Sequence, residues 1–181
     1  RKELGLEDNF VIGHVGRFEN QKNHSFLLDI FAEVVKMKPE ARLVLVGIGS
    51  LMEAMKAKVK ALGLTEKVIF LGFRSDRERI MQGMDSFVFP SLYEGLSVVL
   101  IEAQASGMPV FVSDSTTTEV SYSPYIKFLS LKQNAQEWAK EVVKRGAVER
   151  MDMSLDIRNS GFEINGMIDS LYQLYTESQN N

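Results

Sequence analysis

Cysteine is absent from this sequence, which excludes disulfide bridges, thiolate nucleophiles and cysteine-ligated zinc. Because only two histidines are present, no bound metal is expected either. The 21 basic and 24 acidic residues leave a net charge of −3, so there is no broad basic field that would attract a nucleic acid. No apolar run approaches the roughly 20 residues of a membrane-spanning helix, and the first residues show no signal-peptide pattern.

The composition is that of an ordinary globular domain, with 45% hydrophobic and 25% charged residues. A length of 181 residues suits one domain better than two. The sequence begins at Arg1 and not at a methionine. We therefore expect the chain to be a piece of a longer protein, cut between two domains.

Short apolar runs alternate with segments of helical periodicity along most of the chain. The runs that predict strands are 10–15, 43–46, 68–71, 86–89, 110–112 and 126–129. Helices are expected after a cap at Asn23 and before Pro39, and then at 52–62, 76–84, 98–106, 135–149 and 164–177. This alternation with short links predicts right-handed crossovers and a doubly wound, Rossmann-like α/β domain with a parallel sheet.

In such sheets, ligands bind outside the carboxyl ends of the strands. Five loops are expected at that edge, namely 16–22, 47–50, 72–75, 90–97 and 113–119. Candidate functional residues are therefore sought in these loops and in the first turns of the helices that follow them.

Two carboxylates surround the start of the predicted helix 98–106. Glu94 lies in the preceding loop, where Gly95 lets the backbone approach a ligand closely, and the amides that follow begin a helix, where anions bind well. Glu102 lies on the helical stripe expected to face the sheet, where a carboxylate needs hydrogen bonds or a cation. The pattern favours equally a ligand with phosphate and hydroxyl groups, or a core ion pair of Glu102 beside an ordinary turn.

Two cations follow the first predicted strand. Gly16 permits close backbone approach, and Arg17 and Lys22 flank the start of the next helix. A guanidinium makes forked contacts with phosphate oxygens and an ammonium adds a point charge, so the pair suits a diphosphate. The alternative is that both are solvated surface cations, and the sequence favours it for Lys22 taken alone.

Gly47 and Gly49 follow the second strand, as in a dinucleotide fingerprint, but Met52 fills the third glycine position and no acidic residue ends the next strand. We interpret the two glycines as a tight turn close to the ligand. His14, within a strand, is predicted to be a core histidine, and His24, at the start of a helix, a surface or capping residue.

Taken together, these segments resemble family 4 (group 1) glycosyltransferases over about residues 8–145. Glu94, seven residues and Glu102 match the family's E-x7-E signature, within PSLYEGLS at 90–97 and EAQASGMPV at 102–110. Further matching stretches follow the family's order: VGRF at 15–18, QKN at 21–23, LVLVGIG at 43–49 and IFLGF at 69–73. KNHSFL at 22–27 and VSDSTTTEV at 112–120 resemble the branch that acts in capsular or exopolysaccharide assembly.

The resemblance implies a GT-B architecture, in which two Rossmann-like domains face each other across a cleft. Residues 1–181 would be the C-terminal, nucleotide-sugar-binding domain, and the acceptor-binding N-terminal domain would be absent from this chain. The implied reaction is the retaining transfer of a hexosyl group from a nucleotide sugar, with UDP favoured as the nucleotide, to a glycan or lipid-linked acceptor. It needs neither a divalent metal nor another cofactor, and the fragment alone is expected to transfer little or no sugar.

The resemblance also implies roles for the site residues. Arg17 and Lys22 would hold the donor diphosphate and stabilise the departing nucleotide, Glu94 would bind sugar hydroxyls, and these three form the implied catalytic set. Glu102 would accept hydrogen bonds from the ribose. The other implied contacts come from the surrounding loops: Gly16 at the phosphates, Gly95, Leu96 and Ser97 at the sugar, the backbone around Phe73 and Arg74 at the base, and, with less support, Gly47, Gly49 and Glu119.

Other functions stay open on the sequence alone. The chain could be a nucleotide-sugar-binding module without catalytic duty, or a same-fold epimerase or phosphorylase. Gly47, Gly49 and Arg74 are the residues that would favour an NADP-dependent enzyme. The implied pathway places the protein in the cytoplasm, with peripheral association at the inner face of the plasma membrane as an open alternative and no nucleic-acid partner.

Overall fold

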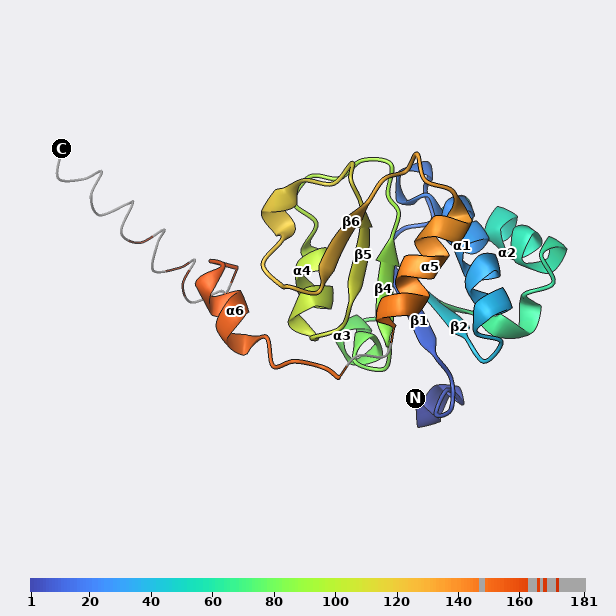
Figure 1. Ribbon diagram of the computed structural model, residues 1–181, viewed down its shortest axis with the longest axis horizontal. Helices are drawn as coiled ribbons and strands as arrows, with labels where there is room; N and C mark the ends of the chain where they lie inside the picture. Colours follow the sequence, from blue (N-terminus) through green and yellow to red (C-terminus); the bar gives the residue numbers. More distant parts are fainter. Residues whose placement is uncertain (147–148, 163–165, 167, 169–171, 173–181) are drawn as a thin grey trace.

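The computed structural model describes residues 1–146, 149–162, 166, 168 and 172. Its centre is a six-stranded sheet, in which every pair of neighbouring strands is parallel (Figure 1). The strand order is β3-β2-β1-β4-β5-β6. The strands are β1 (Val11–Val15), β2 (Arg42–Val46), β3 (Val68–Gly72), β4 (Ser86–Phe89), β5 (Val110–Ser113) and β6 (Ile126–Leu129). The Rossmann-like α/β fold predicted from the alternating pattern is confirmed.

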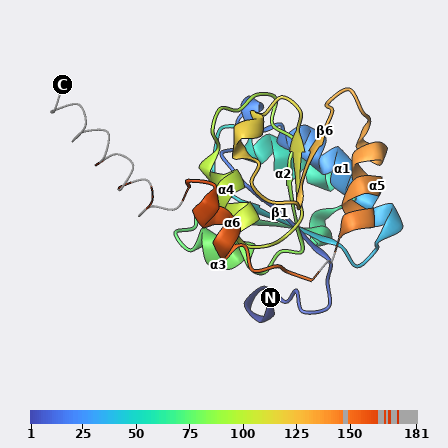
Figure 2. The same cartoon turned by 60° about the vertical axis from the view of Figure 1, so that its left-hand side comes forward.

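Helices cover both faces of this sheet (Figure 2). They are α1 (His24–Met37), α2 (Met52–Ala61), α3 (Arg77–Met81), α4 (Val98–Ala105), α5 (Ala135–Arg145) and α6 (Ser154–Asn159). Four short 3-10 helices join them: η1 (Lys2–Leu4), η2 (Asn20–Lys22), η3 (Thr65–Lys67) and η4 (Thr118–Val120). One apolar cluster joins α1, α2 and α5 to the sheet, and another joins α3 and α4 to the opposite face. No helix among the described residues is long and apolar enough to cross a membrane.

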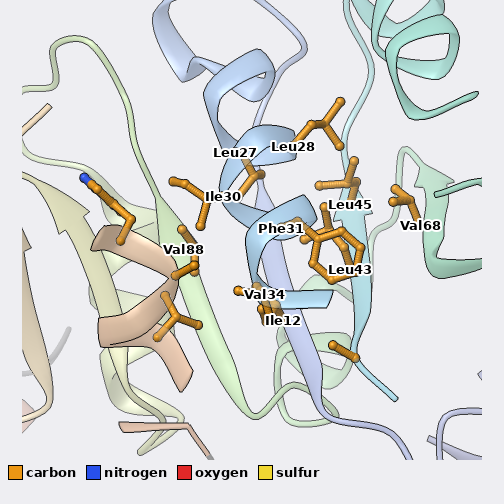
Figure 3. Packing of buried hydrophobic residues seen from close by; sticks show 14 of the residues in the cluster. Ile12, Leu27, Leu28, Ile30, Phe31, Val34, Leu43, Leu45, Val68 and Val88 are labelled. Atoms are coloured by element: carbon orange, nitrogen blue, oxygen red, sulfur yellow. The ribbon is translucent and has the colours of Figure 1, made fainter. Parts of the chain in front are cut away.

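The helical period of α1 explains how it packs. Its apolar residues lie on one side of the helix, over the side chains of β1, β2 and β4 (Figure 3). The residues in contact across this layer include Leu27, Ile30, Phe31 and Val34 from α1 and Ile12, Leu43, Leu45 and Val88 from the strands. Because helices cover both sheet faces, the central strands are buried on both sides, and their sequences are mostly apolar without an alternation of apolar and polar residues.

Several boundaries differ from the sequence-based expectation. The expected helices 76–84 and 135–149 are shorter, α6 was not expected, and most of the helix expected at 164–177 lies outside the described residues. Asn23 does occupy the N-cap position of α1, but with a left-handed φ of 52° and no capping hydrogen bond from its side chain. Its Nδ2 instead donates to the carbonyl of Pro90 at 3.0 Å, which ties the β1–α1 loop to the end of β4.

The position of a ligand site follows from the strand order. β1 and β4 are neighbours in the sheet, yet the helices that follow them, α1 and α4, pack on opposite faces. The chain therefore leaves these two strands in opposite directions and opens a crevice at their carboxyl ends, the topological switch point at which doubly wound folds bind ligands.

Candidate functional site

A cleft of about 600 Å³ opens at this switch point. It lies between the β1–α1 loop, the first residue of α3 and the loop that leads into α4. The residues that line it are Val15, Gly16, Arg17, Glu19, Gln21, Lys22, Arg77, Glu94, Ser97, Val98, Val99 and Glu102. The lining holds cations and carboxylates in equal number, so the cleft is polar although its formal charges balance.

Lys22 and Glu94 form an ion pair inside the cleft. Lys22 Nζ lies 2.5 Å from Glu94 Oε1, and the two side chains are 17% and 8% exposed. The ammonium also lies 4.8 Å from the centre of the Phe89 ring, within range of a cation–π interaction. Lys22 is therefore not the solvated surface cation that the sequence favoured for it alone.

Glu102 forms the second ion pair of the cleft, with Arg77. The guanidinium is forked on the carboxylate, with Nη2 at 2.8 Å from Oε1 and Nε at 3.1 Å from Oε2. This hydrogen bonding raises the pKa of Arg77. The expectation that Glu102 lies on a sheet-facing stripe of its helix is wrong, because Val98 and Ala105 of that stripe are exposed and Glu102 itself is partly exposed. The buried residues of α4 are Leu100, Ile101, Ala103 and Gln104.

Arg17 is the third cation of the cleft. Its side chain is exposed, and it makes no ion pair or side-chain hydrogen bond with any part of the chain that the structure describes. Glu19 nearby accepts hydrogen bonds from the Ser50 amide at 3.1 Å and the Ser50 hydroxyl at 2.9 Å, and these bonds lower its pKa. The guanidinium of Arg17 is thus available to an anionic ligand without breaking an internal contact.

Hydrogen bonds to main-chain carbonyls hold the loop that carries Glu94 in place. The Leu92 amide donates to the Gln21 carbonyl at 2.8 Å, and Gln21 Nε2 donates to the Tyr93 carbonyl at 3.0 Å. On the other side of the loop, Ser113 Oγ donates to the Ser91 carbonyl at 2.5 Å. The loop that carries Glu94 is consequently fixed on both sides before it reaches α4.

Gly95, Leu96 and Ser97 connect Glu94 to α4. A side chain at Gly95 would meet no atom within 4 Å, so open space surrounds this position. Ser97 is the N-cap of α4 and lines the cleft, while its side chain makes no capping bond. The first amides of α4 therefore begin at the edge of the cleft, where a helix N-terminus attracts an anion.

Gly47 and Gly49 pack against the backbone of the β1–α1 loop, which forms one side of the cleft. Gly47 has a φ of 141°, and a Cβ there would lie 2.0 Å from the Gly16 carbonyl oxygen. A Cβ on Gly49 would lie 2.6 Å from the Phe18 amide nitrogen. Both glycines thus let the β2–α2 turn pack against the backbone of the β1–α1 loop, and neither is among the residues that line the cleft.

The comparison with known proteins assigns the family. Residues 1–145 match the family model described as glycosyl transferases group 1. The chain belongs to the group 1 glycosyltransferases. Among its relatives is the putative glycosyltransferase EpsF of Bacillus subtilis, 35% identical over 181 residues, a match that covers 96% of this chain and 47% of the relative.

Two further proteins similar to this group 1 glycosyltransferase have names that mention a nucleotide or nucleotide sugar. An Escherichia coli protein named UDP-Gal:alpha-D-GlcNAc-diphosphoundecaprenol alpha-1,3-galactosyltransferase is 30% identical, over 97% of this chain and 48% of that protein. The crystal structure of Anabaena HepE in complex with UDP has a TM-score of 0.78 and 24% identity, and the match covers 99% of this chain and 51% of that one. The chain thus spans about half the length of the proteins it matches. The fold it shares with them is that of the C-terminal domain of GT-B glycosyltransferases.

Seven of the residues proposed from the sequence are not among those that line the cleft: Gly47, Gly49, Phe73, Arg74, Gly95, Leu96 and Glu119. The Phe73 side chain is 76% exposed, and Glu119 is exposed on η4. Arg74 is forked on Asp76 at 2.8 Å through both contacts, and this pairing lowers the pKa of Asp76 to about 2. The backbone roles implied for 73 and 74 do not depend on where these side chains point, so they stay predictions.

Arg74 lines a second cavity, of about 290 Å³, between η1 and α3. Apolar side chains of β1, β2 and β3 form its floor, and charged residues form its rim. Four of the rim charges are paired with one another, Arg74 with Asp76 and Arg79 with Glu3, and Arg1 pairs with Asp85 beside the cavity. The cavity lies over one face of the sheet and away from the switch point, so the larger cleft is the better candidate site.

The two histidines lie behind the cleft and are both buried. His14 Nδ1 contacts the Val88 carbonyl at 2.9 Å, as expected of a core histidine, and its ring centre lies 4.6 Å from that of His24. His24 stacks on Phe18 at 4.1 Å, so the prediction that it is a surface or capping residue is wrong. Burial lowers the pKa of His14 well below its ordinary value and that of His24 to about 4.

Sequence reasoning missed Arg77, the cation of the cleft that pairs with Glu102. Its partner Glu102 is 25 residues away on another helix, and no local pattern joins the two. The signal that could have found it is the unmatched carboxylate in an apolar helix, which requires a cation from another element.

Proposed function

We propose that residues 1–181 are the donor-binding domain of a retaining, family 4 glycosyltransferase. The donor is a nucleotide sugar, with UDP as the nucleotide and a hexose as the sugar, and the acceptor is a glycan or lipid-linked saccharide of capsular or exopolysaccharide biosynthesis. The acceptor-binding domain lies in the part of the protein that this chain does not include. The names of the relatives and the UDP in the HepE structure support this choice of substrates.

The observation that carries the proposal is the set of cations at the switch point. The Arg17 side chain makes no ion pair or hydrogen bond among the described residues, and Lys22, just before α1, lines the same cleft. Together with the first amides of α4, they form a site for a diphosphate. The carboxylates of Glu94 and Glu102, which line the same cleft, can accept hydrogen bonds from hydroxyl groups. A ligand that carries both phosphates and sugars needs both kinds of group.

These residues also have roles in the reaction. When the bond between the anomeric carbon and the phosphate oxygen breaks, its electron pair remains on the departing diphosphate. Arg17, Lys22 and the α4 amides then face the growing negative charge, and removing one such group typically costs about 2.7–4 kcal/mol of transition-state stabilisation. In the bound state Glu94 exchanges its contact with Lys22 for the sugar hydroxyls, which leaves the ammonium to the phosphate.

Calorimetric titration with UDP tests the proposal. The unaltered chain is expected to bind UDP, and Arg17→Ala to bind it about tenfold to a hundredfold more weakly, as the loss of a charged hydrogen bond predicts. Lys60→Ala is the matched control, because it removes a positive charge from the exposed side of α2. Equal affinity of the Arg17→Ala chain and the control would contradict the assignment.

The catalytic part of the proposal needs the protein with both domains. Release of UDP from a UDP-hexose is expected in the presence of a lipid-linked saccharide, and its loss in Arg17→Ala. Tight UDP binding without any release would instead identify a nucleotide-sugar-binding module.

A further inference from the structure

Arg77 has no role in the site as proposed so far, although it lines the cleft. It is the first residue of α3 and reaches across to α4, where its fork contacts both oxygens of Glu102. The Glu102 side chain is 27% exposed and that of Arg77 48%. The pair is thus neither a core ion pair nor a freely solvated one.

The fork determines what Glu102 can still do. A carboxylate offers about four lone-pair sites on its two oxygens, and two parallel N–H···O bonds occupy one site on each. Each oxygen therefore keeps an acceptor site. Because the fork fixes the orientation of the carboxylate in the cleft, it also fixes the direction of the remaining sites, each of which can accept a hydrogen bond from a ligand hydroxyl.

We infer that Arg77 is a positioning residue that orients Glu102 to accept a hydrogen bond from the 2′-hydroxyl of a ribose. This inference rests on the proposed function, which assigns Glu102 to the ribose of the donor. Within the described chain Glu102 has no other ion-pair or side-chain partner. Without Arg77, its carboxylate would rotate about the side-chain torsions, and the ligand would have to order it on binding.

Competition between Arg77 and the ribose would have the opposite effect on nucleotide binding, and the measurement separates the two. If the guanidinium competed with the ribose for the same lone pairs, its removal would strengthen nucleotide binding. The forked geometry favours positioning, since the two N–H groups contact one carboxylate oxygen each and take only part of its acceptor capacity.

The test compares UDP with 2′-deoxy-UDP, which lacks the 2′-hydroxyl. Both nucleotides are titrated calorimetrically into the unaltered chain, Arg77→Ala, Arg77→Lys and Glu102→Gln. The unaltered chain is expected to prefer UDP, and Arg77→Ala to bind UDP about tenfold more weakly, the effect of one charged hydrogen bond. Its affinity for 2′-deoxy-UDP should change much less, so that the preference collapses as it does in Glu102→Gln.

Two controls separate positioning from a general effect of charge or folding. Arg79→Ala removes a cation from the same short helix without touching Glu102, since Arg79 pairs with Glu3 and Asp76. It should keep the full preference for UDP. Arg77→Lys should restore part of the preference, and adding Arg77→Ala to Glu102→Gln should cause no further loss.

The possible failures are distinguishable. If Arg77→Ala keeps the affinity and preference of the unaltered chain, or binds UDP more tightly, the positioning role is wrong and the proposed function stands. If the unaltered chain binds neither nucleotide, the proposed function is wrong and the role of Arg77 with it. Thermal unfolding of each variant shows whether a loss of binding reflects a loss of the fold.

Discussion

His24 is expected to make the stability of the domain fall between pH 7 and pH 5. Its imidazole is 2% exposed, and burial, assisted by the nearby charge of Lys22, lowers its pKa from 6.5 to about 4. The unfolded chain therefore takes up a proton near pH 6.5, while the folded chain does so only near pH 4. Between these values the unfolded state binds more protons, so the free energy of unfolding decreases as the pH falls.

The size of the effect follows from the pKa difference. At pH 5 the medium is 1.5 pH units below the unfolded pKa of 6.5, and each unit is worth about 1.4 kcal/mol, which gives a loss of about 2 kcal/mol for His24 alone. The loss levels off near about 3 kcal/mol below pH 4. His14, whose pKa is lowered in the same direction, adds to it.

Urea unfolding at pH 7, 6 and 5 measures this loss. His24→Phe is the matched variant, because a phenyl ring can stack on Phe18 as the imidazole does, without titrating. The variant should lose about 2 kcal/mol less than the unaltered chain over the same pH range. The lowered pKa values of Asp76 and Glu19 do not interfere, since carboxylates of depressed pKa lose their stabilising effect at a lower pH. Equal pH dependence of both chains would refute the reasoning.

Two further predictions concern stability. Gly47→Ala should destabilise the domain by about 1–3 kcal/mol more than Gly63→Ala in thermal unfolding, because both positions have positive φ but only the first would bring a Cβ to 2.0 Å from the Gly16 carbonyl oxygen; equal losses would show that this close approach is unimportant. Lys22→Met should cost about 3 kcal/mol in urea unfolding, because it leaves the nearly buried Glu94 carboxylate without its cation. Adding Glu94→Gln should restore most of that loss, and a double variant as unstable as the single one would contradict the explanation.

The sequence was sufficient for the fold because the pattern is local. Strands buried on both faces are mostly apolar runs, and each lies next to a helix whose own periodicity is clear, as in α1. Helix ends were harder to place. Asn23 has the chemistry of a capping residue, but the carbonyl of Pro90 offers its side chain a partner that lies 67 residues away.

The part of the candidate site that depends on local sequence was also predicted. The loops after the strands and the carboxylates within them are visible in the sequence, whereas the partner of each carboxylate is set by the packing of separate elements. The helical position of Glu102 was misleading because α4 is buried mainly through Leu100, Ala103 and Gln104, and Ile101 is the one buried residue of the stripe that Glu102 shares with Val98. His24 was misplaced because its position at a helix start says nothing of the Phe18 and His14 rings that cover it.

The bonds between the Gln21 segment and the loop at Leu92 and Tyr93 constrain how this domain can diversify. On the Leu92–Tyr93 side both bonds use main-chain groups, so the side chains of that loop can be exchanged while the distance between the backbones is kept, provided that Gln21 keeps its amide. Inserting or deleting one residue in either loop would shift that register and separate Lys22 from Glu94. Proteins that use this cleft for other ligands are therefore expected to vary in residue type along the two loops and to keep the loop lengths constant.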